Sequence, residues 1–337
     1  MSTVEASSSR NITNGVRTHT VENQPPPLVD YNVFESDTVM KEAVKREGAD
    51  WATDKISEVG EIAGRGDVVE LGRLANENPP KLRTHDRYGN RVDIPEFHPS
   101  WHELMRLGIS HELHSLPWRD PQPGAHVARS AAFMCFSQAE AGVGCPISMT
   151  SSVVPALRKQ PELAEEWEPR ILSDVYDPRQ IAASEKEGSL FGMGMTEKQG
   201  GSDVRANTTV GKPINGGGAG AEYEITGHKW FFSAPQCDAF LVLAQAERGV
   251  SCFLMPRRLP DGELNRFRLQ RLKDKLGNRS NASSEIEFDG AWTRLVGEEG
   301  AGVRTIIEMV NHTRLDCATG SATGMRAGVA QAINHAS

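Results

Sequence analysis

The sequence has 337 residues with 37 Lys and Arg against 45 Asp and Glu, so its formal net charge is −8 at pH 7. This acidic balance disfavours non-specific attraction to nucleic-acid phosphates over the chain as a whole. No apolar run approaches the roughly 20 residues that a membrane-spanning helix needs, which argues against a membrane protein.

The first half of the chain predicts a polar arm followed by an all-α domain. Residues 1–37 are polar and contain a proline triplet, which favours an extended and solvated backbone. Residues 38–187 place apolar side chains at helical spacing, for example at Trp101, Leu104 and Met105. Proline and glycine clusters punctuate this pattern, so we expect several helices rather than one.

The next region, residues 188–300, predicts a β domain. Apolar and polar residues alternate with strand periodicity, and a short apolar run adds a buried strand. The alternating pairs and the run are Tyr223 with Ile225, Phe267 with Leu269, Ile286 with Phe288, and Phe240 to Ala244. Short strands separated by turn residues indicate a compact antiparallel barrel or sandwich.

Helical periodicity returns over residues 301–337, where Val303, Ile306, Ile307 and Val310 share one face. No proline or glycine stop ends this segment, so we expect the beginning of a helical domain that is incomplete here. The predicted fold is therefore α+β, with an N-terminal all-α domain, a central antiparallel β-barrel or sandwich, and the start of a C-terminal helical bundle.

Cysteine usage and the N-terminus indicate the compartment. The five cysteines are odd in number and form no CxxC pair, which argues against a disulfide framework and a thiolate zinc site. A reducing compartment is the simplest explanation. The N-terminus is polar and lacks the apolar segment of a secretory signal, so we expect a cytoplasmic protein.

The stretch GMGMTEKQGGSDV, residues 192–204, combines glycines with small hydroxyl side chains. It does not complete the dinucleotide-binding glycine pattern, because Glu197 occupies the position of the third glycine. It also lacks the GK[ST] ending of a phosphate-binding P-loop. Exposed amides in a glycine-rich turn can nevertheless form an anion-binding concavity. The alternative is a plain β-turn with a Ser-Asp cap.

Four stretches, in this order and spacing, resemble the acyl-CoA dehydrogenase family. They are Thr196-Glu197 with Gly201-Ser202-Asp203, Gly227-His228-Lys229-Trp230-Phe231-Phe232-Ser233, Lys275-Leu276-Gly277-Asn278-Arg279, and Leu295-Val296-Gly297-Glu298-Glu299-Gly300-Ala301-Gly302. The segments MTEKQGGSDV, GHKWFFS and RLKDKLGNRSNAS are closer still to the AidB-type branch, which comprises bacterial flavoproteins linked to the adaptive response to DNA alkylation. The resemblance runs from about residue 19 to the last residue.

The resemblance implies FAD as the cofactor. Thr196 would hydrogen-bond the flavin ring, while Gly200 and Gly201 would let the backbone approach the pyrophosphate. Ser202 would lie near both the pyrophosphate and the acyl thioester, and is therefore also the implied substrate contact. The full set of implied cofactor contacts is Met193, Gly194, Met195, Thr196, Gly200, Gly201, Ser202, Phe231, Phe232 and Ser233.

Phe231 aligns with the family's aromatic residue beside the flavin, and Ser233 with its hydroxyl at the ring edge. Side chains alternate across a strand, so at least one of Trp230, Phe231 and Phe232 should point away from the cofactor. Phe232 could therefore be a core residue instead.

The resemblance also implies a glutamate that removes the α proton of the acyl group. At one family position, next to Arg314, this sequence has Thr313, which cannot act as that base near neutral pH. The other family position lies beyond Ser337. We therefore assign no catalytic residue. Asp316 and Glu308 lie nearby, and we expect both to be structural or solvated helix residues.

Metal and DNA binding have weaker patterns. His98 and His102 are four residues apart, but neither an HExxH motif nor a third ligand accompanies them, so we expect no metal site. A solvated strand face is the favoured interpretation of the densest basic run. This run comprises Arg266, Arg268, Arg271, Lys273, Lys275 and Arg279.

The leading hypothesis is an FAD-binding flavoprotein of the acyl-CoA dehydrogenase type. It would be an oxidoreductase acting on CH–CH groups and linked to the protection of DNA from alkylation. The alternative is a non-catalytic scaffold that binds flavin, an acyl ligand or DNA. The resemblance implies acyl-CoA or a related acyl ligand and a homo-oligomer, in relatives a tetramer. It implies double-stranded DNA only for a longer form of the chain.

Overall fold

The computed structural model describes residues 24–337, so residues 1–23 of the predicted arm lie outside the described residues. The helices are α1 (Thr38–Arg46), α2 (Thr53–Gly64), α3 (Gly66–Glu77), α4 (Pro99–Ser110), α5 (Leu116–Arg119), α6 (Ala125–Phe136), α7 (Gly144–Leu157), α8 (Pro161–Ile171) and α9 (Gly302–Ala336). Single 3₁₀ turns occur at Asp50–Ala52, Ala183–Glu185 and Val204–Ala206. The strands are β1 (Lys81–His85), β2 (Arg91–Glu96), β3 (Phe191–Gly194), β4 (Val210–Pro213), β5 (Glu222–Ser233), β6 (Ala239–Ala246), β7 (Gly249–Pro256), β8 (Phe267–Leu272) and β9 (Ser283–Leu295).

Helix α4 begins at a capping residue and buries the predicted face. The His98 side chain accepts a hydrogen bond from the Ser100 amide, which satisfies one of the free amides of the first turn. Trp101, Leu104 and Met105 are buried in the core. The helical spacing predicted from these three residues is therefore confirmed.

Residues 29–37 pack onto α2 instead of extending as a solvated arm. The Asp30 amide donates a hydrogen bond to the Gly64 carbonyl at 2.7 Å. Val33 and Phe34 are fully buried. These two apolar side chains complete the helical core, so the second part of the predicted arm belongs to the helical region.

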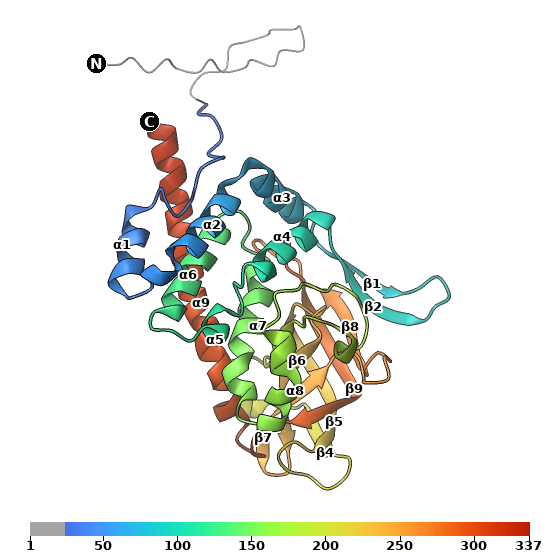
Figure 1. The fold of residues 1–337 in the computed structure, drawn as a ribbon. Coiled ribbons are helices and arrows are strands. Elements are labelled where there is room, and N and C mark those ends of the chain that lie inside the picture. Colours follow the sequence, from blue (N-terminus) through green and yellow to red (C-terminus); the bar gives the residue numbers. More distant parts are fainter. Residues whose placement is uncertain (1–23) are drawn as a thin grey trace, which may run out of the picture.

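A β-hairpin interrupts the helical region, and the sequence did not predict it. Strands β1 and β2 pair antiparallel, and the Asp86 carboxylate closes their turn by accepting hydrogen bonds from the Tyr88 and Asn90 amides. The hairpin packs against β8 (Figure 1). There Arg91 donates to the Leu269 carbonyl at 2.8 Å. No residue of β1 is fully buried, so its sequence lacks the apolar alternation that identifies a strand.

Strands β3 to β9 form one sheet that closes on itself as a barrel. Neighbours follow the order β3-β5-β4-β6-β7-β9-β8, and the additional pairings β3–β6 and β5–β9 complete the closure. Tyr223 and Ile225 of β5 are buried, as their alternation predicted. Most pairs are antiparallel, but β3 and β4 run parallel to β6. Parallel pairing requires a long connection: β4 and β5 lie in the chain between β3 and β6, and β5 lies between β4 and β6. The predicted α+β class and central barrel are confirmed.

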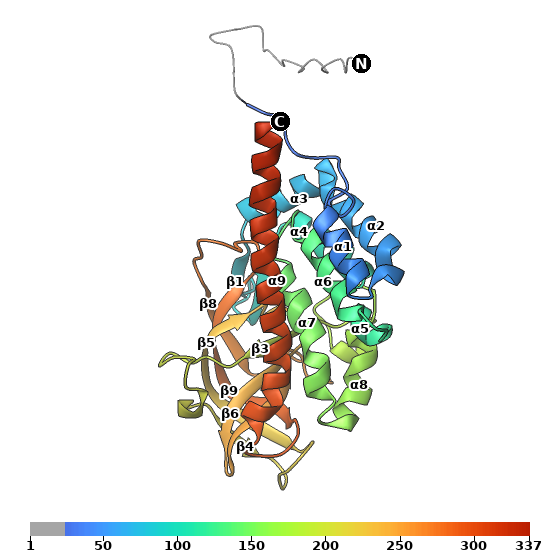
Figure 2. The same ribbon diagram turned by 90° about the vertical axis from the view of Figure 1, so that its left-hand side faces the viewer.

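Helix α9 lies along the boundary between the helical layer and the barrel (Figure 2) and contacts α6, α7, β6 and β7. The buried Arg129 of α6 binds Asp316 of α9 through two hydrogen bonds, of 2.6 and 2.8 Å. Further along α9, Arg326 donates to the Asp37 carboxylate and to the Val33 carbonyl, each at 2.7 Å.

Over residues 24–337, no helix combines the length and apolar character needed to cross a membrane.

A second buried ion pair joins the turn after β3 to β5. Lys229 Nζ lies 2.8 Å from Glu197 Oε1, and both side chains are 0% exposed. The amides of Thr208 and Thr209 also donate to this carboxylate, at 2.7 and 3.1 Å. Burial acts to raise the pKa of Glu197, but Lys229 and these donors hold it well below its ordinary value. Burial lowers the pKa of Lys229 to about 8, against the opposing effect of Glu197.

Replacing Asp316 by Ala would leave the Arg129 guanidinium buried without its counter-charge. We expect the free energy of unfolding, measured by urea denaturation, to fall by about 3–5 kcal/mol. The matched control is Glu308→Ala on the same helix, which breaks a partly exposed pair with Lys159. This control should cost less than about 1 kcal/mol. Equal losses in the two variants would contradict a dominant role for the Arg129–Asp316 pair.

Replacing Glu197 by Gln would leave the Lys229 ammonium buried and unpaired. We expect a loss of about 3–5 kcal/mol in the free energy of unfolding near neutral pH. The double variant Glu197→Gln/Lys229→Met should lose less than the sum of the two single variants, because neither partner then remains as an isolated charge. Strictly additive losses would exclude the coupling.

The contribution of Glu197 to the free energy of unfolding should depend on pH, which provides a second test of the pair. Because the folded-state pKa is depressed, this contribution is present above the ordinary glutamate pKa of 4.5 and is lost as the pH falls toward the folded value. The difference in unfolding free energy between the wild type and Glu197→Gln should therefore narrow below pH 4.5. A difference that stays constant down to acid pH would contradict this sign.

Candidate functional site

A cavity of about 700 Å³ lies where the helical layer, the barrel and α9 meet. We call it the central cavity. Side chains from α6, α7, β3, β5 and α9 line it together with short connecting segments. The lining residues are Phe133, Ser137, Ala141, Gly144, Cys145, Ser148, Met149, Met193, Met195, Thr196, Phe231, Ser233, Asn278, Thr313, Asp316, Cys317, Gly320, Ser321, Thr323, Gly324 and Ala327.

The barrel side of the central cavity contains five of the ten cofactor contacts implied by the sequence. Met193, Met195 and Thr196 come from β3 and the residues directly after it, and Phe231 and Ser233 come from the end of β5. The two segments are adjacent because β3 pairs with β5 at Gly194 and Phe232, and the Trp230 amide donates to the Thr196 carbonyl at 2.8 Å. Residues that are far apart in the sequence therefore form one wall.

A bulge in β5 at Trp230 and Phe231 sets the orientations of Phe231 and Phe232. Between Lys229 and Phe232, β5 has one more residue than its partner β9, so the alternation of side chains shifts at this point. Phe231 is 53% exposed and faces the central cavity, whereas Phe232 is 0% exposed. The Phe232 ring packs 4.5 Å from the Phe240 ring inside the barrel. Its side chain therefore points away from the cavity, which is the alternative that strand alternation left open.

Glycine at position 194 is required by this packing. A Cβ atom on Gly194 would lie 2.5 Å from Phe232 Cδ2, so any larger residue would displace the buried ring. Gly194 is itself buried and does not line the central cavity. Of the implied cofactor contacts, Gly194 and Phe232 thus occupy the barrel core just behind the cavity wall.

The glycine-rich stretch forms a tight turn beside Thr196. The Gly200 amide donates to the Glu197 carbonyl at 3.0 Å, and Gly200 has a φ of 131°, which favours glycine. A Cβ atom on Gly201 would lie 2.5 Å from Thr196 Oγ1, so the turn packs closely against that hydroxyl. Gly201 and Ser202 are exposed to solvent, outside the cavity lining. The structure therefore places these backbone groups next to the cavity and accessible from outside.

The α9 side of the central cavity is built from small and polar residues. Asp316 is the carboxylate among the described lining residues, and both of its oxygens are held by Arg129. The Thr313 hydroxyl donates to the Val310 carbonyl at 2.9 Å. Neither side chain is available as a base in this arrangement, and Asp316 has the structural role expected from its position in the sequence. Glu308 lies outside the lining and pairs with Lys159 at 3.1 Å.

The cavity floor on α7 was not identified from the sequence. Cys145, Ser148 and Met149 line it, yet small residues on a helix are also typical of ordinary packing. Burial raises the pKa of the Cys145 thiol, so the group is a neutral thiol at physiological pH. Asn278 was also missed as a contact, although it lies within the Lys275 to Arg279 stretch that carried the family resemblance.

Three of the histidines, His98, His102 and His114, have structural partners. His98 caps α4, and His102 Nδ1 lies 2.8 Å from the Tyr176 hydroxyl. His114 Nε2 lies 3.0 Å from the Ser173 carbonyl oxygen. Across the residues that the structure describes, no group of three or more His, Cys, Asp or Glu side chains is arranged to hold a metal ion.

The basic run follows β8 and its exit, where acidic residues of β9 neutralise part of it. Arg268 pairs with Asp289 at 2.9 Å, and Arg271 and Lys273 both pair with Glu285, at 2.8 and 2.7 Å. Arg268, Arg271 and Asp289 are exposed, as on a solvated sheet face, whereas Glu285 and Lys273 are largely buried. The structure thus gives these cations local partners.

Comparison with protein families covers most of the chain. Residues 23–178 match the family described as "Adaptive response protein AidB N-terminal domain". Residues 192–291 match the family described as "Acyl-CoA dehydrogenase, middle domain". The second match contains both the glycine-rich turn and the end of β5, and therefore the barrel side of the central cavity.

Two curated relatives are similar in sequence. The chain is 51% identical to the putative acyl-CoA dehydrogenase AidB of Escherichia coli K12 over 322 residues, which are 95% of this chain and 59% of that protein. It is 32% identical to acyl-CoA dehydrogenase family member 11 of Caenorhabditis elegans, over 77% of this chain and 43% of that protein. The chain thus spans about half the length of these relatives.

Solved structures have the same fold. The crystal structure of C. elegans ACDH-11 in complex with C11-CoA superposes with a TM-score of 0.80 and 29% identity, covering 96% of this chain and 55% of that one. The apo-form of Bd2924 gives a TM-score of 0.81 and 27% identity, covering 93% and 62%. Together with the sequence matches, these similarities establish that the chain belongs to the acyl-CoA dehydrogenase family and carries an AidB-type N-terminal domain.

Proposed function

We propose that the chain is an FAD-binding flavoprotein of the acyl-CoA dehydrogenase type, an oxidoreductase acting on CH–CH groups. One observation carries the proposal. Five residues implied as flavin contacts come from two separate segments, and the barrel brings them to one wall of a cavity of about 700 Å³. Their convergence is independent of the family matches, because it follows from strand pairing.

The described residues suit a flat aromatic ring with polar edges. Met193 and Met195 offer apolar surface, and the half-exposed ring of Phe231 lies at the mouth of the same wall. The hydroxyls of Thr196 and Ser233 supply hydrogen-bonding groups that can orient the ring edge. When bound, the flavin would accept the hydride that leaves the β carbon of the acyl group.

We further propose that the turn at Gly200 and Gly201 approaches the cofactor pyrophosphate, with Ser202 near the pyrophosphate and the thioester. These residues are accessible beside the cavity, and amides in a glycine turn favour an anion. Gly194 and Phe232 would act through the backbone or by supporting the wall, since the Phe232 ring is packed within the barrel.

An acyl group would occupy the part of the central cavity between α6, α7 and α9. Phe133, Met149 and Ala327 provide apolar lining there, and glycines of α9 leave space. The similar structure of C. elegans ACDH-11 was determined with C11-CoA, which supports an acyl-CoA ligand for this chain. We assign no catalytic base within residues 24–337, because Asp316 is held by Arg129 and position 313 is a threonine.

The biological setting follows the AidB-type relationship. We propose a cytoplasmic protein that forms a homo-oligomer, with a tetramer as the expected assembly, and that contributes to the protection of DNA from alkylation. We propose double-stranded DNA as a partner only for a longer form of the chain. The basic residues of β8 are partly neutralised by Asp289 and Glu285, which disfavours that strand as the binding surface.

Flavin binding can be tested directly. The purified chain, incubated with excess FAD and desalted, should be yellow and should release the cofactor on denaturation. Removing the hydroxyl in Thr196→Val or Ser233→Ala should raise the Kd for FAD by about two- to tenfold, the expected effect of one neutral hydrogen bond. The control Ser110→Ala, at the end of α4, should leave the Kd unchanged. A chain that stays colourless and shows no rise in Tm with FAD would contradict the proposal.

Two observations favour the alternative of a non-catalytic flavin or acyl scaffold. The Asp316 carboxylate is already bound by Arg129, and position 313 has a threonine, which cannot act as the base. Anaerobic addition of acyl-CoA esters to the FAD-loaded chain separates the two functions. An oxidoreductase should lose the flavin absorbance as the ring is reduced. A scaffold should bind the ester, detected by calorimetry, while the flavin spectrum remains oxidised. Loss of absorbance with straight or branched esters would eliminate the scaffold.

A further inference from the structure

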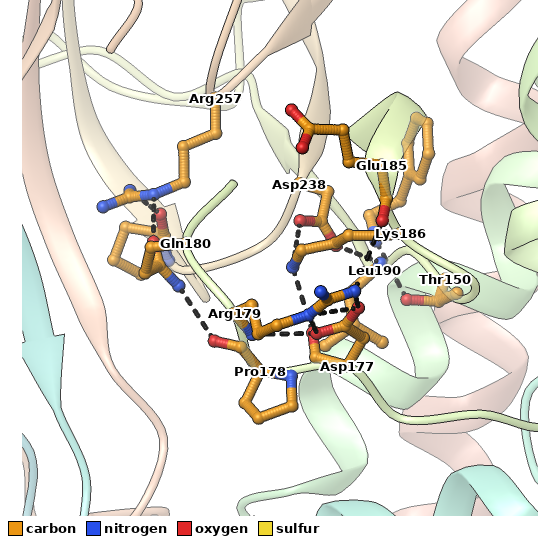
Figure 3. A network of polar contacts seen from close by, with 12 residues as sticks. Thr150, Asp177, Pro178, Arg179, Gln180, Glu185, Lys186, Leu190, Asp238 and Arg257 are labelled. Atoms are coloured by element: carbon orange, nitrogen blue, oxygen red, sulfur yellow. Dashed lines mark hydrogen bonds and ion pairs between the residues drawn. The ribbon is translucent and has the colours of Figure 1, made fainter. Parts of the chain in front are cut away.

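A buried ion pair lies at the entry to β3 (Figure 3). Lys186 Nζ is 2.7 Å from Asp238 Oδ1, and the two side chains are only 3% and 7% exposed. The second carboxylate oxygen of Asp238 accepts a hydrogen bond from the Leu190 amide at 2.9 Å. Leu190 directly precedes β3, the strand that carries Met193.

Asp238 contacts Leu190 through its backbone as well. Its amide donates to the Leu190 carbonyl at 2.9 Å, so both polar backbone groups of Leu190 are bound to one residue. The next amide, that of Phe191, donates to Thr150 Oγ1 of α7 at 3.0 Å. The entry to β3 is thus held from the barrel on one side and from the helical layer on the other.

The connection before β3 is held by the same network. Lys186 Nζ also donates to the Asp177 carbonyl at 3.0 Å, and the Asp177 carboxylate pairs with Arg179 at 2.6 Å (Figure 3). The buried Arg257 donates to Gln180 Oε1 at 2.9 Å. The loop between α8 and β3 is therefore fixed by side chains that originate on the barrel and within the loop itself.

The position of Asp238 links this network to the central cavity. β3 pairs in parallel with β6 from Phe191 opposite Ala239, the residue that follows Asp238. A one-residue shift of this register would exchange the faces of β3 and turn Met193 away from the cavity. Ser233, at the end of β5, lies only a short turn before Asp238 and lines the same cavity.

We propose that Asp238 is a positioning residue, which fixes the register of β3 against β6 through the Leu190 amide and so places Met193, Met195 and Thr196 in the cavity wall. Lys186 is the counter-charge that allows the carboxylate to remain buried. The proposed benefit to flavin binding rests on the function proposed above, whereas the placement of β3 does not. A buried ion pair alone is weak evidence for stability, so the directed hydrogen bond to Leu190 is the distinguishing feature.

Two double variants separate the hydrogen bond from the charge. Asp238→Asn/Lys186→Met removes both charges but keeps an oxygen that can accept from the Leu190 amide. Asp238→Leu/Lys186→Met removes the charges and the acceptor together. Val44→Ala, in the buried face of α1, serves as a control that lowers stability without touching β3. Amide hydrogen exchange of the peptide spanning residues 190–197 is measured in the cofactor-free chain, together with the Kd for FAD.

Asp238→Leu/Lys186→Met should exchange its amide hydrogens at residues 190–197 about five to one hundred times faster than the wild type. This is the effect expected for one unsatisfied buried amide. Its Kd for FAD should rise in parallel. In Asp238→Asn/Lys186→Met and in Val44→Ala, the exchange rate of this peptide relative to the other barrel strands should stay as in the wild type. Equal exchange in the two double variants, or acceleration spread evenly over the whole barrel, would overturn the proposal. A wild-type chain that binds no FAD would refute the proposed function, while the exchange data would still decide the role of Asp238.

Discussion

The buried pair between Glu197 and Lys229 is the contact on which the barrel wall of the central cavity depends. Without a charge on Lys229, the carboxylate would be an isolated ion in the barrel, and such a group is too costly to bury. The pair joins the residue after Thr196 to the residue before Trp230, so the two segments that form the cavity wall cannot separate. The Thr208 and Thr209 amides also donate hydrogen bonds to the Glu197 carboxylate and so fix its orientation. The position that breaks the dinucleotide-binding pattern thus has a structural role of its own.

The central cavity exists because three layers meet without filling the space between them. The barrel contributes a rigid wall, α6 and α7 contribute the floor, and α9 closes the side with residues too small to occupy the volume. Two buried charged contacts fix parts of this arrangement: Arg129 with Asp316 ties α6 to α9, and Asp238, directly before β6, pairs with Lys186 in the loop that leads to β3. Breaking either pair by removing one partner would leave an uncompensated buried charge, so each pair disfavours rearrangement of the segments that it joins.

Much of this architecture could be predicted from the sequence, for physical reasons that also define the limit. The faces of α4 and β5 were visible because Trp101 and Tyr223 belong to regular apolar periods. The β1–β2 hairpin was not visible, because β1 has no buried residue and the buried positions of β2 are Asp93 and Pro95, which do not give an apolar strand period. The orientation of Phe231 and Phe232 depends on a bulge in β5, and a single sequence does not show where an extra residue enters a strand. The resemblance named both residues as contacts, but only the three-dimensional pairing distinguishes the one facing the cavity.

Helix α9 is a single long helix that is anchored at two places. At 1.5 Å per residue its 35 residues extend about 50 Å, from the barrel past the cavity to the N-terminal segment. Its distal part is clamped by Arg326 to Asp37 and Val33, while Asp316 fixes it beside the cavity. These two anchors restrain α9 both beside the cavity and in its distal part. The small residues of α9 that bound the cavity are therefore positioned by two separate anchors, one beside the cavity and one at the segment near Asp37.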